Sequence, residues 1–329
     1  MNVTTRRALK EDLEKIYRFN EKYYSRLNHG KEYVDFWCSK EENALERILL
    51  MVDENNDIIA QNFFSSMSYF YAGNKIETVW GFDLLVNEEG RKQNLGVQFM
   101  LRQRDAEKNM LSVGANDIAL SMLLNMHYKK IGELKTYIGI GNPLWLFQTL
   151  FKSNDIIEKC PLQIKVDSFT FTKTKVEDIP DLNEPLNFNL LEPGRDKDFI
   201  RWRFFNKFHK YAFYRLEGTQ FFFVVRPIKK YHFSIMELVD YRCNVNDKTI
   251  LFAIIKAFKY LANKMHYALL YTGSSLKIVD EALEYNGLKK IRKNRPIIWL
   301  KKTDDIKDEI IERNFIYLTL ADSDGEIAL

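Results

Sequence analysis

The stretch that decides the fold is Asn87-Glu-Glu-Gly-Arg-Lys-Gln-Asn-Leu-Gly-Val-Gln-Phe-Met100. It follows an apolar run from Val79 to Val86 and leads into a segment, Val97 to Asn109, with the periodicity of a helix. A strand that passes through a tight loop into a helix presents unpaired backbone N–H groups at the helix start, where the helix dipole also favours negative charge. This order predicts a binding site for a phosphate group, with an ordinary strand-to-helix turn as the alternative.

The residue types in the loop suit such a ligand. Gly96 would let the backbone approach a phosphate closely, and Arg91 and Lys92 would add cationic donors. The loop contains neither Gly-x-x-x-x-Gly-Lys-Ser/Thr nor Gly-x-Gly-x-x-Gly, so it is not one of these two common nucleotide-binding loops.

Arg91-Lys-Gln-Asn-Leu-Gly96 resembles the Arg/Gln-x-x-Gly-x-Gly/Ala signature of the GCN5-related N-acetyltransferases. Asn94 stands where the first glycine is usual, and Asn tolerates left-handed backbone better than most residues with a side chain. The resemblance covers the chain from about Thr4 to Pro143. It implies that the pyrophosphate of acetyl-coenzyme A binds here, at Arg91, Lys92, Gln93, Asn94, Leu95, Gly96 and Val97.

Two further stretches resemble the same family. Trp80 to Val86 resembles its fourth strand, which implies that the backbone of Leu84, Leu85 and Val86 contacts the pantetheine arm of the cofactor. Asn125-Met-His-Tyr-Lys-Lys-Ile-Gly132 resembles a shortened form of the Asn-to-Tyr-x-x-x-Gly ending of the helix after the fifth strand. The resemblance implies that Asn125 and Tyr128 lie at the cofactor and that Tyr128 protonates the departing thiolate.

Candidate bases lie on the strand before the loop. An amine that attacks a thioester must be neutral, so a carboxylate can remove its proton, and Asp83 and Glu77 are the acids available there. Residues six apart share a face of a regular strand, although a bulge at Gly81 would break that relation. A solvent-facing role is the alternative for both acids, and His127 is more simply read as an incidental surface histidine.

The composition is that of a globular protein of about two domains: 329 residues, 46% apolar and 29% charged, with a formal net charge of +4. The weak, interleaved charge predicts no nucleic-acid partner. The cysteines Cys38, Cys160 and Cys243 lack the spacing of a metal site, so no metal is expected. With no run of eighteen apolar residues and no apolar leader, we expect a soluble, cytoplasmic monomer or homodimer with no membrane partner.

The order of predicted elements is that of an α/β protein. We expect two similar domains, at 1–172 and 197–329, joined by a Pro-containing linker at 173–196. The resemblance to the GCN5-related N-acetyltransferases implies that each domain is a mixed, mostly antiparallel central sheet flanked by helices, the second being a degenerate copy without the cofactor loop. The first set of helices is expected at 10–24, 39–49, 96–109 and 125–131, with strands at 50–52, 58–71, 76–86 and 118–123. The second set of helices is expected at 248–265 and 276–285, with strands at 211–216, 220–226, 234–241, 267–271 and 297–301.

The second half differs from the first where a second cofactor loop would lie. Between Tyr241 and Lys248 the sequence is Arg-Cys-Asn-Val-Asn-Asp, with no glycine, so one cofactor site per chain is expected. An unusual segment runs from Asp198 to Tyr211. Its polar and aromatic residues could bind an anionic or sugar-like acceptor, but a helix that packs Trp202 and Phe205 into the core with its arginines outward is favoured. The acceptor candidates in this segment are Arg201, Trp202, Arg203, His209 and Lys210.

These observations predict an N-acetyltransferase that moves an acetyl group from acetyl-CoA directly to a primary amine of a small molecule or sugar. A tRNA-dependent aminoacyltransferase of related fold is one alternative, which the near-neutral charge and the pyrophosphate loop disfavour. A non-catalytic ligand-binding or interaction protein, in which the loop is only a turn, is the other.

Overall fold

The structure is a computed structural model that describes residues 2–23, 30–107, 109–146, 157–179, 182, 184–208, 210–230, 233–291, 294–302 and 315–323. Within these ranges no helix has the length and apolar character needed to cross a membrane. The candidate His209 lies outside the described residues.

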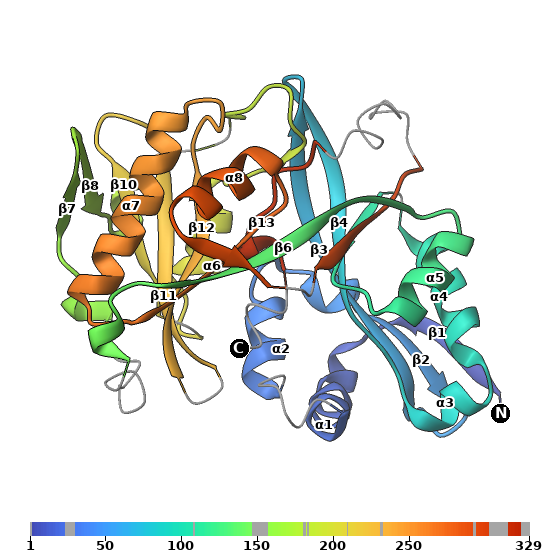
Figure 1. Cartoon of the computed structure of the whole chain (residues 1–329). Helices are drawn as coiled ribbons and strands as arrows, with labels where there is room; N and C mark the ends of the chain where they lie inside the picture. The colour runs from blue at the N-terminus through green and yellow to red at the C-terminus, as the bar shows by residue number, and fades with distance from the viewer. Residues whose placement is uncertain are drawn as a thin grey trace.

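The first half of the chain alternates long strands with helices (Figure 1). Its strands are β1 (Val3–Arg7), β2 (Leu49–Asp53), β3 (Ile58–Tyr71), β4 (Asn74–Val86), β5 (Met110–Val113) and β6 (Lys129–Ile140). Its helices are α1 (Leu13–Tyr23), α2 (Lys31–Cys38), α3 (Glu88–Lys92), α4 (Leu95–Ala106) and α5 (Asp117–Asn125).

From residue 192 onwards the second half follows a similar order, after an additional hairpin at residues 163–173. Its strands are β7 (Gln163–Val166), β8 (Phe169–Lys173), β9 (Glu192–Pro193), β10 (Ala212–Leu216), β11 (Phe222–Lys230), β12 (Phe233–Arg242), β13 (Leu269–Ser274), β14 (Leu288–Lys290) and β15 (Arg295–Leu300). Its helices are α6 (Lys197–Phe204), α7 (Lys248–Lys264) and α8 (Lys277–Tyr285).

The described strands form one continuous sheet with a main order of β1-β2-β3-β4-β5-β15-β6-β13-β12-β11-β10-β8-β7. Most neighbours are antiparallel, and the parallel pairs are β4 with β5 and β12 with β13. The two halves exchange strands. β15, from the end of the second half, pairs with β5, while residues 135–140 of β6, from the first half, pair with β13.

This exchange crosses the expected domain division. The β7–β8 hairpin lies at residues 163–173, almost entirely within the expected first domain. Its strand β8 nevertheless pairs with β10 of the second half. Because each parallel pair is flanked by a strand from the other half, the two halves share backbone hydrogen bonds as well as side-chain contacts. The division into domains at 1–172 and 197–329 stays a prediction.

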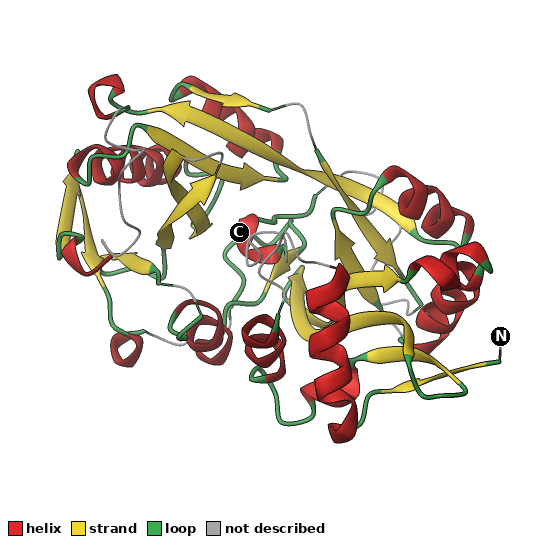
Figure 2. Ribbon diagram, turned by 90° about the horizontal axis from the view of Figure 1, so that it is seen from below, coloured by secondary structure: helices red, strands yellow, loops and turns green. Residues whose placement is uncertain are grey.

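Helices cover both faces of the sheet (Figures 1 and 2). Helices α4 and α5 pack on the first half through a core that includes Phe99, Met100 and Leu123, and α7 and α8 pack on the second half through a separate core. On the other face, α1, α2 and α6 contribute to a single core that also takes residues from strands of both halves. That shared core makes one body of the two halves.

Three predicted elements were wrong. The helix expected at 39–49 is not formed: α2 lies before it, where the buried residues at helical spacing are Tyr33, Val34, Phe36 and Trp37, and Ala44–Arg47 is a 3₁₀ turn before β2. The strand expected at 118–123 is α5, since a short apolar run does not distinguish strand from helix and Asn116 caps this one by accepting a hydrogen bond from the Ala119 N–H. The helix expected at 125–131 is a turn at His127, whose φ is 69°, followed by β6.

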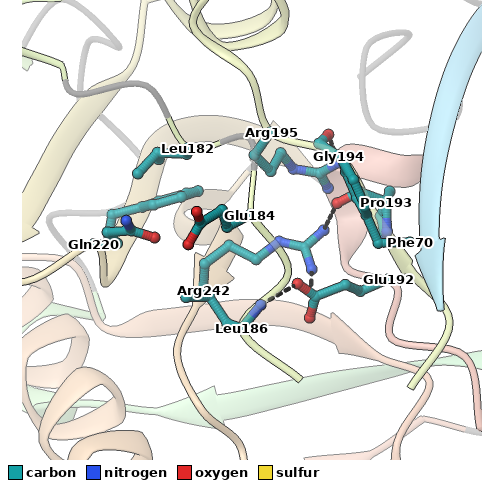
Figure 3. Close-up of a pocket in the computed structure, with 11 residues that line it drawn as sticks. Phe70, Leu182, Glu184, Leu186, Glu192, Pro193, Gly194, Arg195, Gln220 and Arg242 are labelled. Carbon is teal, nitrogen blue, oxygen red and sulfur yellow. Dashed lines mark hydrogen bonds and ion pairs between the residues drawn. The ribbon is translucent and has the colours of Figure 1, made fainter. Parts of the chain in front are cut away.

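The predicted linker is tied to both halves rather than free. Leu186 N–H donates to Glu192 at 2.6 Å, β9 pairs with β3, and Arg242 of β12 donates to the Pro193 carbonyl at 3.1 Å (Figure 3). Beside these contacts lies a cavity of about 20 Å³. It has room for about one water molecule, which makes it part of the packing rather than a ligand site.

Candidate active site

The first feature of the site is a split in the sheet between β4 and β5. The two strands pair in parallel only at Val79 with Met110 and at Trp80 with Leu111. Beyond this point the Ser112 hydroxyl donates to the Gly81 carbonyl at 2.7 Å, and β4 continues to Val86 without a strand on that side in the described chain. The free edge of β4 therefore exposes backbone groups that an extended ligand can bond, as a further strand would.

A β-bulge sets the direction of β4 in the split. Phe63 lies opposite Phe82 and Gln61 lies opposite Leu85, so β4 carries one extra residue there. Asp83 is in that bulge with a left-handed φ of 51°. The predicted interruption of strand parity is thus present, at Asp83 rather than at Gly81.

The second feature is the loop from Asn87 to Gly96. Asn87 ends β4 and caps α3 by accepting a hydrogen bond from Gly90 N–H at 2.7 Å. Asn94 then takes left-handed backbone, with φ 58° and ψ 23°, and turns the chain into α4. The tolerance of Asn for this conformation, expected from the sequence, is what allows it to stand in for glycine.

The N-terminus of α4 is open. The Asn94 side chain makes no capping hydrogen bond, so it does not occupy the first N–H groups of α4, where the positive end of the helix dipole lies. Arg91 and Lys92 are exposed beside them. Backbone donors and two cations at one point form a suitable site for a phosphate or pyrophosphate.

The two glycines of the loop serve different purposes. A Cβ on Gly90 would lie 2.7 Å from Ile59 Cγ2 and 2.9 Å from Val86 Cγ1, so Gly90 is required by packing against β3 and β4. A Cβ on Gly96 would meet only Val86 Cγ2, at 3.6 Å, which is an ordinary contact. Packing within the protein does not explain the glycine at 96, whereas a ligand against the helix start would.

The second half has closed the corresponding position. The loop after β12 contains Asp247, whose carboxylate accepts hydrogen bonds from Thr249 N–H at 3.0 Å and Ile250 N–H at 3.3 Å at the start of α7. A carboxylate there both occupies the helix donors and repels phosphate. This contrast with α4 supports the prediction of one cofactor site per chain.

The structure separates the two candidate bases. Asp83 is buried in the bulge, directly beyond the point where β4 leaves β5. Glu77 lies before the paired region, near the β3–β4 turn; its side chain is 70% exposed and forms an ion pair with Lys75 at 2.7 Å. Asp83 is therefore the better placed of the two, and the catalytic role of either stays a prediction.

Asn125 and Tyr128 do not lie on the same helix. Asn125 is the exposed last residue of α5, and Tyr128 follows the turn at His127. Tyr128 is buried between α4 and α5, and its hydroxyl has no hydrogen-bond partner among the described residues. Burial raises the pKa of Tyr128, an effect partly offset by Arg104, so the hydroxyl stays protonated.

Sequence reasoning missed three residues around the split. Asn62 donates to the carbonyls of Phe63 and Phe82, at 2.8 and 3.0 Å, across the bulge. Ser112 bonds Gly81, and Asn116 opens α5 directly after β5. Asn116 could have been found as a helix cap, because Asn followed by an apolar run is a start signal. The other two have no local signal.

The α6 segment follows the core interpretation with one correction. Trp202 is buried, and Arg201 is exposed and pairs with Asp198 at 3.2 Å, as expected. Arg203 was expected to face outward but is fully buried, where it donates to the Ala321 carbonyl at 3.3 Å and the Tyr211 hydroxyl at 3.2 Å. Tertiary partners far along the chain hold this arginine inside.

No family model matches this chain, and no curated protein matches it in sequence. Among solved structures, a GCN5-related N-acetyltransferase from Anabaena variabilis superposes with a TM-score of 0.62 over 92% of this chain and 73% of the other, at 10% identity. The chain has the fold of the GCN5-related N-acetyltransferases. The fold expected from the Arg91–Gly96 motif is confirmed.

Other structures with this N-acetyltransferase fold are also similar. The N-myristoyltransferase of Saccharomyces cerevisiae, crystallised with myristoyl-CoA, has a TM-score of 0.60 over 96% of this chain and 89% of its own, at 14% identity. A probable N-acyltransferase from Enterococcus faecalis has a TM-score of 0.57 over 91% of this chain and 72% of its own, at 9% identity. At such identities the likeness establishes the architecture, not the donor or acceptor.

Proposed function

We propose that this chain is an acyl-CoA-dependent N-acyltransferase that moves an acetyl group from acetyl-CoA to a primary amine of a small molecule or sugar. The observation that carries the proposal is the open N-terminus of α4 next to the split between β4 and β5. The pyrophosphate would lie at the loop from Gln93 to Val97, on the backbone N–H groups of Leu95 to Val97, because those of Gln93 and Asn94 already donate to the carbonyls of Glu89 and Arg91. The pantetheine arm would run along the free edge of β4. Solved structures of this fold include N-acetyltransferases and an N-myristoyltransferase with bound myristoyl-CoA, and this supports an acyl-CoA as the donor.

The chemistry needs few side chains. The neutral amine attacks the thioester carbonyl, a new C–N bond forms, and the C–S bond breaks. Asp83, directly or through water, takes the proton that the amine loses, and Tyr128 gives a proton to the departing thiolate. A backbone N–H on the free edge of β4 stabilises the negative charge on the carbonyl oxygen.

Calorimetric titration with acetyl-CoA tests the donor site. We expect about one site per chain, and no binding at high ligand concentration would contradict the proposal and favour a non-catalytic protein. Gly96→Val should abolish binding while the protein stays folded, because the added atoms enter the ligand space. Gly30→Val is the matched control: an added Cβ there would meet only Glu21, at 3.7 Å or more, away from the loop.

A charge comparison and an activity assay complete the test. Arg91→Gln should weaken acetyl-CoA binding, whereas Arg201→Gln, at an exposed arginine of α6, should not. Thiol release should then be measured with amines from amino sugars, amino acids and peptides. Binding of acetyl-CoA without thiol release from any of these would count against catalysis and leave a ligand-binding role.

A further inference from the structure

The split between β4 and β5 ends against a wall of aromatic rings. Trp80 and Phe82 of β4 point to the face of the sheet that carries α2, and Trp37 of α2 packs over both. The ring centroids of Trp37 and Phe82 are 4.0 Å apart, and those of Trp37 and Trp80 are 5.5 Å apart. All three side chains are at most 5% exposed.

The second half of the chain supports this wall from behind. Trp202 of α6 packs against Trp37 at a centroid distance of 5.1 Å and stacks on Phe36 at 4.8 Å. Its indole Nε1 donates to the Phe36 carbonyl at 3.0 Å. One hydrogen bond and two ring contacts thus join α2 to Trp202 of α6. A shift of Trp37 away from the sheet would therefore also displace α6.

The position of the wall matters because of how a cofactor would enter. An arm that starts at the α4 N-terminus and runs along β4 cannot pass the point where Trp80 pairs with Leu111. Its end must lie near Gly81 and Phe82. There the α4 side is closed, since even a Cβ on Gly81 would lie 2.7 Å from Met110 Sδ and 3.1 Å from Ser112 Oγ.

An acyl group near Gly81 and Phe82 would therefore have packed protein atoms on both faces of the sheet. Protein interiors are close-packed, so a chain of many methylenes needs a cavity that already exists or that neighbouring residues open. Two larger cavities lined by described residues lie elsewhere. One of about 1100 Å³ is lined by Phe188, Ser275 and Ile278, and one of about 450 Å³ is lined by residues of β1 and β2 and by Gln98 and Arg102 of α4.

We propose that Trp37, Trp80 and Phe82 form the end wall of the acyl site and restrict the donor to short acyl chains of about the size of an acetyl group. The inference rests on the proposed function, because it assumes that acyl-CoA binds along β4. It names the residues that would limit the acyl-chain length of the donor. The fold by itself leaves that length open.

The test is the affinity for free CoA, acetyl-CoA, octanoyl-CoA and tetradecanoyl-CoA, measured by calorimetry on the full chain. The unmodified protein should bind acetyl-CoA at least about tenfold more tightly than octanoyl-CoA. Phe82→Ala should reduce or reverse this ratio by opening space behind the split. Phe213→Ala removes the same number of atoms from the same core, in β10, and should leave the ratio unchanged.

The outcomes separate the two proposals. If free CoA and acetyl-CoA bind but tetradecanoyl-CoA binds as tightly as acetyl-CoA, the wall is refuted while the acyltransferase proposal stands. If Phe82→Ala and Phe213→Ala change the ratio equally, the wall is also refuted. Binding of neither CoA nor acetyl-CoA overturns both. Should Phe82→Ala fail to fold, Phe82→Leu and Trp37→Phe must show a smaller shift in the same direction, and no shift in either refutes the wall.

Discussion

The Nδ2 atom of Asn62 lies 3.0 Å from the carbonyl oxygen of Phe82, and it thereby joins β3 to the bulge of β4. The same amide donates to the Phe63 carbonyl at 2.8 Å, and the side chain is fully buried. One amide group thus donates to two carbonyls at the bulge. The shape of the free edge of β4 depends on it.

Asn62→Leu should therefore destabilise the protein and deform the proposed donor site at the free edge of β4. Two buried carbonyls would lose their donor, at a cost of about 1–3 kcal/mol in the free energy of unfolding, measured with urea. Acetyl-CoA affinity should fall in the same variant. Asn142→Ala, which removes the cap of an exposed 3₁₀ turn, should change neither quantity by much, and an equal loss of affinity in both would contradict the assignment.

Asn94 should accept glycine and resist alanine. Its left-handed φ of 58° costs roughly 1 kcal/mol or more for a residue with a Cβ and no local hydrogen bonding, and little for glycine. Asn94→Gly should keep both stability and acetyl-CoA affinity, while Asn94→Ala should lower the free energy of unfolding by about 1 kcal/mol. Equal stability of the two variants would show that the loop relaxes to another conformation.

Lys40 should make stability depend on alkaline pH. Its ammonium contacts the Ser65 hydroxyl at 2.7 Å, the Ser66 carbonyl and the Trp202 ring, and burial lowers the pKa of Lys40 to about 8, although Glu41 and Asp196 oppose this. The folded chain therefore holds this proton less tightly than the unfolded chain does. The contribution of Lys40 to the free energy of unfolding should rise between pH 8 and about 10.5, by roughly 2–3 kcal/mol.

The measurement is the difference in the free energy of unfolding between the unmodified protein and Lys40→Met across that pH range. The subtraction removes the titration of other groups common to both. A difference that stays constant from pH 8 to 10.5 would show that the Lys40 ammonium is not desolvated in the folded state.

Tyr128→Phe should separate stability from chemistry. The hydroxyl is buried with no partner among the described residues, so its removal should leave the free energy of unfolding unchanged or raise it by up to about 1 kcal/mol. If the hydroxyl protonates the thiolate, thiol release should fall by about a hundredfold, the lower part of the usual range for acid catalysis. Unchanged turnover in a folded variant would remove Tyr128 from the mechanism.

Local sequence predicted the strand, loop and helix around Asn87–Met100 because each has a strong short-range cause. The apolar run before the loop, the turn residues within it and the periodic segment after it act over a few residues. The same reasoning went wrong at residues 118–131. There a nine-residue helix and the start of a strand both contain apolar residues, so the apolar pattern does not distinguish them. The prediction also left out the helix cap at Asn116.

The sequence by itself determined the loop from Asn87 to Gly96, with its tolerated left-handed Asn94, and the absence of a similar glycine-containing loop before Lys248. Tertiary structure decided what surrounds that loop. The pairing of β15 with β5, the bond of Arg203 to the Ala321 carbonyl and the packing of Trp202 on Trp37 join residues more than a hundred positions apart. Such contacts depend on how two half-sheets combine into one, and no local preference of the residues involved encodes that arrangement.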